Sequence, residues 1–470
     1  MKRFLKLKSV FMLFAMTSLV LSCSDDDDGG GLPDPIIPGE DIVDLALGNA
    51  DLNDLVVALQ AADGDLVSVL RGDGPFTVFA PTNEAFDAFL TANGFANLEA
   101  VPTDVLSLIL LNHVVAGENL STSLSTGYIS SSSTAGVGGA NLSLFIDTSS
   151  GVEINGVSTV TTADVNASNG VIHIVDAVIG LPNIVDHAVA NPDLSDLVGA
   201  LTADDNTTFT DLLSDADEDF TVLAPVNGAF AFFNNPNDND INNVLSNHVI
   251  VGAAALSTDL STGYDLSTAG TNDDGDNLSL YVNTDDGVVF NGNSTVIAAD
   301  IVATNGIIHA VDAVIDIPTV VTFATADPNF STLVSALTDL TPGTEFAAIL
   351  SRTEGGNGDG IDPDFTVFAP TNDAFDALAA IPEEDVLTQV LLHHVVGGAN
   401  VRSGDLTDGI SPETLEGDNI IINLPGTNGN IADVTDGAGN TGIGIIAVDV
   451  QAGNGVIHVL NTVLLPDTMN

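Results

Sequence analysis

Residues 76–81 read Phe76-Thr77-Val78-Phe79-Ala80-Pro81, and nearly the same six residues return at 220–225 and 365–370. The spacings between these copies are 144 and 145 residues. Periods of about 20–50 residues are typical of solenoids and propellers, so a period this long indicates whole domains in tandem. A chain of 470 residues is long enough for three such domains.

Two further blocks recur in the same order after each copy of the first. The sequence Asn-His-Val-Val, or a close variant, stands at 112–115, 247–250 and 393–396. The sequence Asn-Gly followed by two β-branched residues and histidine stands at 169–173, 305–309 and 454–458. We therefore predict three copies of one domain, at 40–182, 183–318 and 319–470.

These blocks resemble the fasciclin (FAS1) family, whose first block is similar to residues 74–86, and the resemblance extends from about Glu40 to near the end of the chain. It implies an α+β fold of three tandem FAS1-like domains, each a β-sandwich-like wedge with packed helices. It also implies an extracellular adhesion role without enzymatic activity.

Local apolar patterns predict helices and hairpins in each copy. Leu52, Leu55, Val56 and Leu59 are spaced as one face of a helix, and residues 194–201 and 330–337 repeat the spacing. Asn191-Pro192 and Asp327-Pro328 are typical of helix starts, where a missing backbone donor costs least. The recurrent Asn-Gly between β-branched stretches predicts a hairpin.

The N-terminus reads as an export and anchoring segment. Residues 1–22 combine a basic start with an apolar run of about a dozen residues, which predicts a signal peptide rather than a membrane span. Leu19 to Cys23 resemble a bacterial lipobox, so Cys23 is the expected lipidation site; the alternative is a secreted protein with one free thiol. Residues 23–39, with Asp25 to Asp28, glycines and prolines, predict a solvated tether.

The charge balance excludes one class of partner and favours others. The chain has 65 Asp and Glu against 7 Lys and Arg, a formal net charge of -58. Nucleic-acid binding depends on basic side chains, so it is excluded. After residues 1–22 only Arg71, Arg352 and Arg402 remain as basic residues. The expected partners are cell-surface or matrix proteins or polysaccharide, with the membrane reached through the lipid anchor.

The histidines are predicted to be structural. Six of the eight occupy two recurrent positions, namely His113, His248 and His394, and His173, His309 and His458. Each domain thus offers two recurrent histidines about 60 residues apart and no cysteine, whereas zinc sites usually need three or four converging ligands. No nucleophile elbow or phosphate loop is present in the sequence. We therefore expect no catalytic residues and no enzymatic activity.

Two loops carry residues that suggest binding. Arg71-Gly72-Asp73 spells an integrin-recognition tripeptide, but a turn with an incidental arginine is the preferred interpretation. Residues 357–364 alternate carboxylates with glycines, so Asp359, Asp362 and Asp364 are predicted to bind calcium weakly, although the EF-hand pattern is incomplete and a solvated acidic loop is the alternative. Calcium is the one candidate cofactor, and the residues that bind the adhesion partner are unknown.

Together these features predict a non-enzymatic adhesion or extracellular binding lipoprotein. The expected location is the outer membrane, lipid-anchored and facing the cell surface, with a periplasm-facing or secreted protein as alternatives. The alternative function is a periplasmic or surface accessory protein that binds a small apolar ligand. The sequence leaves open the adhesion ligand, the domain that binds it and the oligomeric state.

Overall fold

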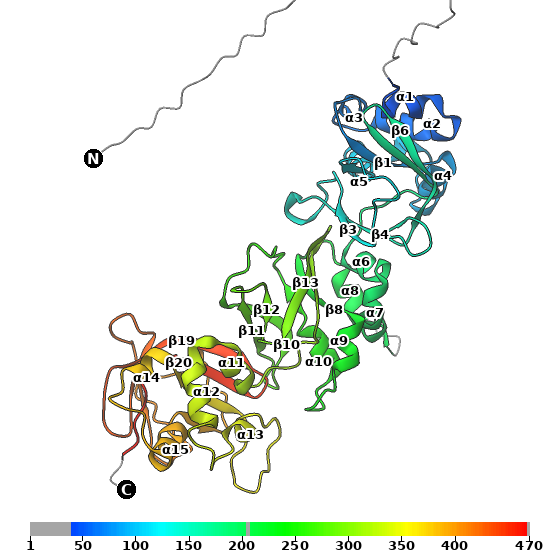
Figure 1. Cartoon of the computed structure of the whole chain (residues 1–470). Helices are drawn as coiled ribbons and strands as arrows, with labels where there is room; N and C mark the ends of the chain where they lie inside the picture. The colour runs from blue at the N-terminus through cyan, green and yellow to red at the C-terminus, as the bar shows by residue number, and fades with distance from the viewer. Residues whose placement is uncertain (1–38, 204–206, 468–470) are drawn as a thin grey trace, which may run out of the picture. The chain divides into compact units, whose positions relative to one another are not determined.

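The computed structural model describes residues 39–203 and 207–467. The predicted signal peptide, Cys23 and all of the predicted tether except Gly39 lie outside the described residues. Within the described ranges, each predicted domain contains one mixed sheet with helices packed against it (Figure 1). We call residues 40–182, 183–318 and 319–467 repeats 1, 2 and 3.

The main elements follow a similar order in each repeat, although the sheet has seven strands in repeats 1 and 2 and six in repeat 3. Repeat 1 contains α1 Ile42–Gly48, η1 Ala50–Leu52, α2 Asn53–Ala61, α3 Leu66–Leu70, β1 Phe76–Pro81, α4 Asn83–Ala92, η2 Leu98–Ala100, α5 Thr103–Asn112, β2 Val114–Ala116, β3 Gly127–Ser130, η3 Val137–Gly139, β4 Ser143–Asp147, β5 Glu153–Ile154, β6 Ser158–Ala167 and β7 Gly170–Val175.

Repeat 2 contains α6 Ile184–Ala190, η4 Pro192–Leu194, α7 Ser195–Leu201, α8 Thr208–Leu213, β8 Phe220–Pro225, α9 Asn227–Phe232, α10 Ile241–Ser246, β9 Val249–Val251, β10 Gly263–Thr271, β11 Asn277–Asn283, β12 Val289–Phe290, β13 Ser294–Ala303 and β14 Gly306–Val311. Repeat 3 contains α11 Val320–Ala326, η6 Pro328–Phe330, α12 Ser331–Thr338, α13 Phe346–Leu350, β15 Phe365–Pro370, α14 Asn372–Asp376, α15 Glu384–Leu392, β16 Val395–Gly397, η7 Ser403–Asp405, β17 Ile421–Asn423, β18 Ala432–Thr435, β19 Ile443–Ala452 and β20 Gly455–Leu460.

The strand order shows how the recurrent blocks meet. In repeat 1 the order is β2-β1-β7-β6-β5-β4-β3, and β1 pairs in parallel with β7, so the first and third blocks lie side by side. Strand β6 pairs with β5 near its start and with β7 along most of its length. Its register shifts between Val160 and Val165, and such bulges bend a strand. One bent strand therefore belongs to both halves of the wedge.

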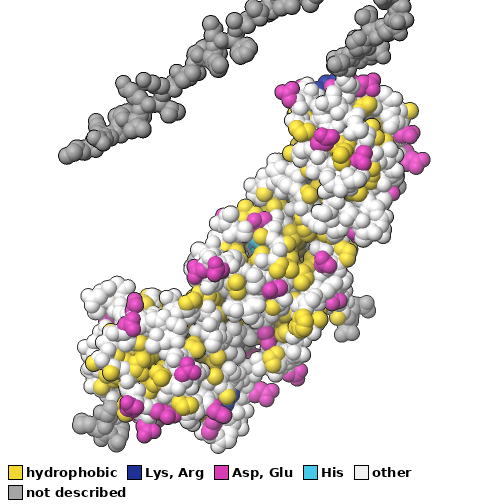
Figure 2. All heavy atoms as spheres, in the orientation of Figure 1, with side chains coloured by type: hydrophobic (Ala, Val, Ile, Leu, Met, Phe, Trp, Pro, Cys, Tyr) yellow, Lys and Arg dark blue, Asp and Glu magenta, His cyan; other side chains and the backbone are white. Residues whose placement is uncertain are grey.

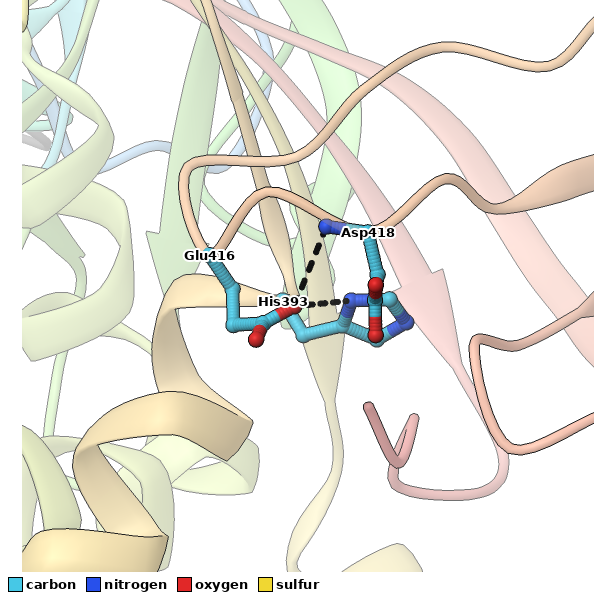
Figure 3. Close-up of side chains that lie close together, drawn as sticks. All are labelled: His393, Glu416 and Asp418. Carbon is cyan, nitrogen blue, oxygen red and sulfur yellow. Dashed lines mark hydrogen bonds and ion pairs between the residues drawn. The ribbon is translucent and has the colours of Figure 1, made fainter. Parts of the chain in front are cut away.

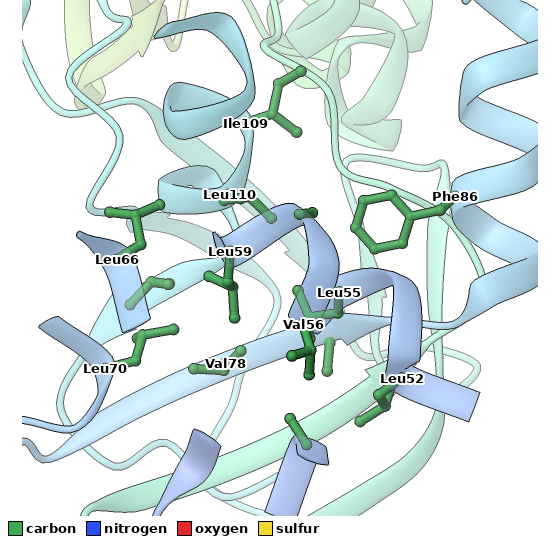
Figure 4. Close-up of a cluster of buried hydrophobic side chains, with 14 of the residues drawn as sticks. Leu52, Leu55, Val56, Leu59, Leu66, Leu70, Val78, Phe86, Ile109 and Leu110 are labelled. Carbon is green, nitrogen blue, oxygen red and sulfur yellow. The ribbon is translucent and has the colours of Figure 1, made fainter. Parts of the chain in front are cut away.

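Strand β1 separates two cores by the alternation of its side chains. Val78 and Ala80 pack into the larger cluster with the helices, while Phe79 packs into a smaller cluster with Leu144 and Ile146 of β4. Figure 4 shows α2 laying its apolar side chains against Val78. Leu55, Val56 and Leu59 are buried on that helix, so the helix prediction is confirmed.

The predicted starts at Asn191-Pro192 and Asp327-Pro328 are also confirmed, although each begins a short 3-10 turn before the α-helix. Asn191 accepts a hydrogen bond from the backbone N–H of Asp193, and Asp327 accepts one from Asn329. Proline follows each cap at the first helical position, where no intrahelical donor is lost.

The predicted hairpin is present, but the Asn-Gly pair serves a different purpose. Ala167 pairs with Gly170, so Ser168 and Asn169 form the turn and Gly170 already belongs to β7. Gly170 has φ +152, and a Cβ there would lie 2.0 Å from the carbonyl oxygen of Phe76. Glycine is therefore required by the close approach of β1.

Among residues 39–203 and 207–467, no helix has both the length and the apolar character needed to cross a membrane.

Candidate functional site

In each repeat, the first recurrent histidine joins the end of one α-helix (α5, α10 or α15) to the loop after the last strand of the same repeat. In repeat 1, Nδ1–H of His113 donates to the carbonyl oxygen of Ile109 at 2.8 Å, and Nε2 accepts from the backbone N–H of Ile179 at 2.9 Å. His248 and His394 make the same two bonds. Burial lowers the pKa of all three imidazoles to about 4. Each ring is neutral and fully used at neutral pH, so the structural interpretation is confirmed here.

The second recurrent histidine holds a surface loop against the sheet. Nε2–H of His173 donates to the carbonyl oxygen of Asn119 at 2.9 Å, and Nδ1 accepts from Asp164 N–H at 3.3 Å. His309 repeats both bonds, while His458 makes only the Nε2 bond among the described residues. These rings are buried and belong to β7, β14 and β20.

A pair of hydrogen bonds between an aspartate and a serine holds the same loop and was not predicted from the sequence. The carboxylate of Asp164 accepts hydrogen bonds from the backbone N–H and the hydroxyl of Ser121 at 2.8 and 2.6 Å. Asp300 and Asp449 bind Ser257 and Ser403 in the same way. Asp164 has a positive φ of 61, which only a few residue types tolerate. The recurrent Asp therefore has a structural role that its spacing could have suggested.

One described group of three His or acidic side chains has the compactness of a metal site: His393, Glu416 and Asp418, with ligand atoms within 4.8 Å of one another (Figure 3). His393 stands where repeats 1 and 2 have Asn112 and Asn247, which donate hydrogen bonds to carbonyl oxygens of the closing loop.

The hydrogen bonds of His393 argue against metal ligation. Its Nε2 accepts from Gly437 N–H at 3.0 Å. The Thr414 hydroxyl donates to the carbonyl oxygen of Asp418, so its oxygen is free to accept from Nδ1–H of His393 at 3.2 Å. Both ring nitrogens are thus engaged, and no lone pair points to a cation. Burial lowers the pKa of His393, while the nearby Glu416 and Asp418 oppose that shift.

The predicted calcium loop has partners of its own. The guanidinium of Arg352 binds both carboxylate oxygens of Asp359, at 3.0 and 2.8 Å, and lowers the pKa of that carboxyl to about 2. Asp362 accepts from the backbone and side-chain amides of Asn357, both at 2.9 Å. Burial, followed by repulsion from Asp274, raises the pKa of Asp364. The three aspartates are not among the described clusters with converging ligand atoms.

The arginine of the Arg-Gly-Asp tripeptide is occupied. Arg71 binds Asp41 and Asp44 through its two terminal nitrogens, at 2.7 and 2.8 Å. The carbonyl oxygen of Gly72 accepts a hydrogen bond from the Asn169 side chain. The tripeptide is therefore held by contacts within repeat 1, through Arg71 to the start of α1 and through Gly72 to Asn169, as the turn interpretation predicts.

The enclosed apolar hollows between the helices and the sheets are small, whereas two open hollows with mixed polar and apolar linings measure about 380 and 350 Å³. In repeats 2 and 3, equivalent hollows of about 60 Å³ lie between the helices and the sheet, and the corresponding space in repeat 1 is about 10 Å³. Pockets for drug-sized ligands usually measure about 300–1000 Å³. The enclosed hollows are therefore too small, as they stand, for a pigment or a lipid chain.

The surface offers many carboxylates and few cations (Figure 2). The described arginines are all paired with carboxylates, since Arg402 binds Asp276 at 2.5 Å in addition to the pairs of Arg71 and Arg352. The described surface therefore presents many acidic side chains, and each described arginine is already paired with one of them.

Comparison with known proteins identifies the fold family. A model of the fasciclin domain matches residues 50–182, 192–318 and 328–466. Transforming growth factor-beta-induced protein ig-h3 of Sus scrofa is 29% identical over 429 residues, which cover 87% of this chain and 55% of that protein. The chain thus spans about half the length of this relative.

Two further similarities involve surface proteins. The cell surface glycolipoprotein MPB83 of Mycobacterium bovis is 29% identical over 154 residues, which cover 31% of this chain and 60% of that protein. The solved structure of a FAS1 domain pair from the insect cell adhesion molecule fasciclin I is 20% identical, covers 57% of this chain and 97% of that chain, and has a TM-score of 0.37. With three matches of the domain model along its length, the chain belongs to the fasciclin family.

Proposed function

We propose that the protein is a non-enzymatic adhesion or extracellular binding lipoprotein that acts through its three fasciclin domains at the cell surface. The observation that supports this most directly is the threefold match to the fasciclin domain, because relatives with the domain include a protein named as a cell surface glycolipoprotein. The hydrogen bonds of the recurrent histidines are internal to each repeat, which supports a structural role for them and not a catalytic one.

Three linked copies suit attachment by weak contacts. Once one domain has bound, the others search for partners at a high effective concentration, so avidity rises without a deep pocket in any copy. The acidic surface favours partners that carry cations or that bind through divalent ions, because like charges repel.

Anchoring is assigned to Cys23. Acylation of this cysteine would hold the chain at the membrane, since each buried methylene contributes about 0.8 kcal/mol. We expect the wild-type protein to incorporate a palmitate analogue and to sediment with outer membranes, and Cys23→Ser to do neither. Protection of the wild-type protein from protease on intact cells would contradict surface exposure and favour the periplasm.

We propose that the loop at residues 357–364 binds calcium weakly. Arg352 already neutralises Asp359, so the cation has to compete with the guanidinium. We expect Arg352→Gln to increase calcium affinity measured by calorimetry, and the double variant Asp359→Ala, Asp362→Ala to abolish it. Equal affinity in all three proteins would remove the loop as a calcium site.

The adhesion function is tested by attachment. Beads coated with residues 24–470 are presented to bacterial cells and to a polysaccharide panel, with calcium and then with chelator. Capture that exceeds that of beads coated with an unrelated acidic protein is expected, and its loss in chelator would assign the bridge to calcium. No capture under either condition would contradict adhesion and direct attention to small apolar ligands that copurify.

A further inference from the structure

Residues of successive repeats contact one another through equivalent aromatic clusters. At the contact between repeats 1 and 2, Tyr128 of β3 packs on Phe145 of β4 with ring centroids 5.0 Å apart. The ring of His187, from α6, packs edge-on against Tyr128 at 5.6 Å. Ser143 Oγ accepts a hydrogen bond from Val302 N–H of β13 at 2.9 Å. The cluster thus joins two strands of repeat 1 to a helix and a strand of repeat 2.

The contact between repeats 2 and 3 uses the same positions with one difference. Tyr264 packs on Tyr281 at 4.9 Å, and Phe323 of α11 meets Tyr264 edge-on at 5.6 Å. Ser279 Oγ accepts from Gln451 N–H at 2.9 Å, as Ser143 does from Val302. Phe323 therefore occupies the position in repeat 3 that His187 occupies in repeat 2. The two contacts thus differ by a titratable ring in the first and an apolar ring in the second.

His187 has one hydrogen bond in a fully buried site. Its Nε2–H donates to the carbonyl oxygen of Val302 at 3.2 Å, and its Nδ1 has no partner among the described residues. A proton on Nδ1 would place an unpaired donor and a positive charge against the rings of Tyr128 and the surrounding apolar groups. A buried charge without a partner is strongly unfavourable.

The ionisable groups on the neighbouring elements do not offset this charge. On α6 itself, Asp186 accepts from the backbone N–H of Asn183 in the capping box. Of the other elements packed against α6, α7 and α8 carry the exposed Asp196 and Asp211, and β14 carries His309, whose hydrogen bonds go to Ala255 and Asp300. On η4, the exposed Asp193 acts on Tyr128, whose pKa burial raises to about 12.

The strands that carry the rest of the cluster are similar. Asp147 of β4 accepts from Ser149 N–H, and Asp300 of β13 is held by Ser257. Tyr128 is the titratable group on β3. None of these carboxylates receives a hydrogen bond from the imidazole of His187.

We propose that the contact between repeats 1 and 2 is an acid-sensitive hinge: protonation of His187 opens it, whereas the contact between repeats 2 and 3 stays closed because Phe323 cannot take up a proton. The second contact also holds the ion pair between Arg402 and Asp276, which joins the two repeats. The chain would thus bend at one of its two junctions when the medium becomes acidic.

The size of the effect follows from proton linkage. Burial lowers the pKa of His187 from 6.5 to about 4 in the closed contact, and an exposed ring in the open contact has the ordinary value. The open state therefore gains protons first as the pH falls. Between pH 7 and pH 5 the closed-to-open ratio should fall by about 20-fold, provided that only this group differs.

The experiment measures the two contacts separately in the same chain. Cys23 is the sole cysteine, so residues 24–470 accept labels at introduced cysteines alone. Donor and acceptor dyes are placed at Ala88→Cys and Ala231→Cys for the first contact, and at Ala231→Cys and Ala377→Cys for the second. All three alanines are exposed. Single-molecule energy transfer is then recorded from pH 7 to pH 4.5, with far-UV circular dichroism to confirm that the repeats stay folded.

We expect a second, low-transfer or broadened population to grow with acid for the first pair and not for the second. His187→Phe, which introduces the ring that Phe323 supplies at the other contact, should abolish this pH dependence. His187→Gln, a neutral polar side chain, should do the same if the phenylalanine disturbs packing. The proposal is overturned if His187→Gln keeps the wild-type pH response, if both pairs respond equally, or if the repeats unfold before the first pair changes.

Discussion

Asn305 provides a sharp test of how each repeat is closed. Its side-chain oxygen accepts from the backbone N–H of Ile184 at 3.1 Å, and its amide donates to the carbonyl oxygens of Leu213 and Asp215 at 2.7 and 3.1 Å. Asn169 and Asn454 make the same three bonds in repeats 1 and 3. One side chain thus ties the first helix of a repeat to the loop before its central strand. We consider the substitution Asn305→Ala.

The magnitude follows from which groups lose their partners. The bonds to Ile184 N–H and to the carbonyl oxygen of Leu213 are buried, whereas the bond to Asp215 is only partly buried. A buried backbone group left unpaired costs about 1–3 kcal/mol, and the third group can turn to water. We expect the free energy of unfolding of repeat 2 to fall by about 2–6 kcal/mol, a large share of the roughly 5–15 kcal/mol of an ordinary domain.

The assay has to report on repeats one at a time. Urea titrations of residues 24–470 are read by hydrogen–deuterium exchange mass spectrometry, using peptides from β1, β8 and β15 to follow repeats 1, 2 and 3. At a urea dependence of about 1.5 kcal/mol per molar, a loss of about 3 kcal/mol moves the midpoint of repeat 2 by about 2 M. Asn293→Ala is the matched control, because Asn293 is exposed in the same repeat and its side chain makes no hydrogen bond among the described residues.

Two results would refute this reasoning. A shift of the repeat 2 midpoint no larger than that of Asn293→Ala would show that the three bonds contribute no net stability. An equal loss of unfolding free energy in all three repeats would show that the Asn305 side chain does not act on its own repeat alone. Asn169→Ala and Asn454→Ala should move the midpoints of repeats 1 and 3 in the same manner.

Three further predictions follow from the same structure. In calorimetry, Gly170→Ala should lower the melting temperature of repeat 1 far more than Gly127→Ala. Both glycines have positive φ, but only at Gly170 would a Cβ meet the backbone, 2.0 Å from an oxygen. Equal losses would show that the close approach of β1 to Gly170 does not require glycine. The pKa values of His113, His248 and His394 lie near 4 in the folded state and near 6.5 in the unfolded state, so the unfolded chain binds protons first as the pH falls. The free energy of unfolding, measured in urea, should therefore be unchanged above about pH 6.5 and fall by up to about 3 kcal/mol per repeat as the pH drops towards 4. A free energy that does not change with pH would contradict the buried neutral rings. Arg71→Ala should leave cell capture by coated beads unchanged, since the guanidinium is engaged with Asp41 and Asp44, and a loss of capture would restore the tripeptide as a recognition site.

The helices and the hairpin could be predicted from the sequence because their signals are local. Leu55, Val56 and Leu59 face the core at the spacing of one helical face, and the chain direction reverses beside Asn169 as expected. Gly170 itself is required by the close approach of β1 and not by the turn. That approach joins residues almost a hundred positions apart, which no short pattern encodes.

The candidate sites show the same division. The paired recurrence of the histidines allowed a structural role to be inferred, whereas the tautomer of His113 depends on a carbonyl oxygen one turn back and an N–H group 66 residues ahead. The loop at 357–364 carries the oxygens that calcium prefers, but the sequence does not reveal that Arg352 already binds Asp359.

The sequence by itself determined the number of domains, their family and the sign of their surface charge, because repeats, motifs and composition are properties of the chain. Only the tertiary structure decided which partner each polar group takes: Asn305 with Ile184 and Leu213, Asp359 with Arg352, and His187 with an aromatic ring of the preceding repeat. Hydrogen bonds and buried charges depend on distance and on exclusion of water, and both are set when segments far apart in the chain pack together.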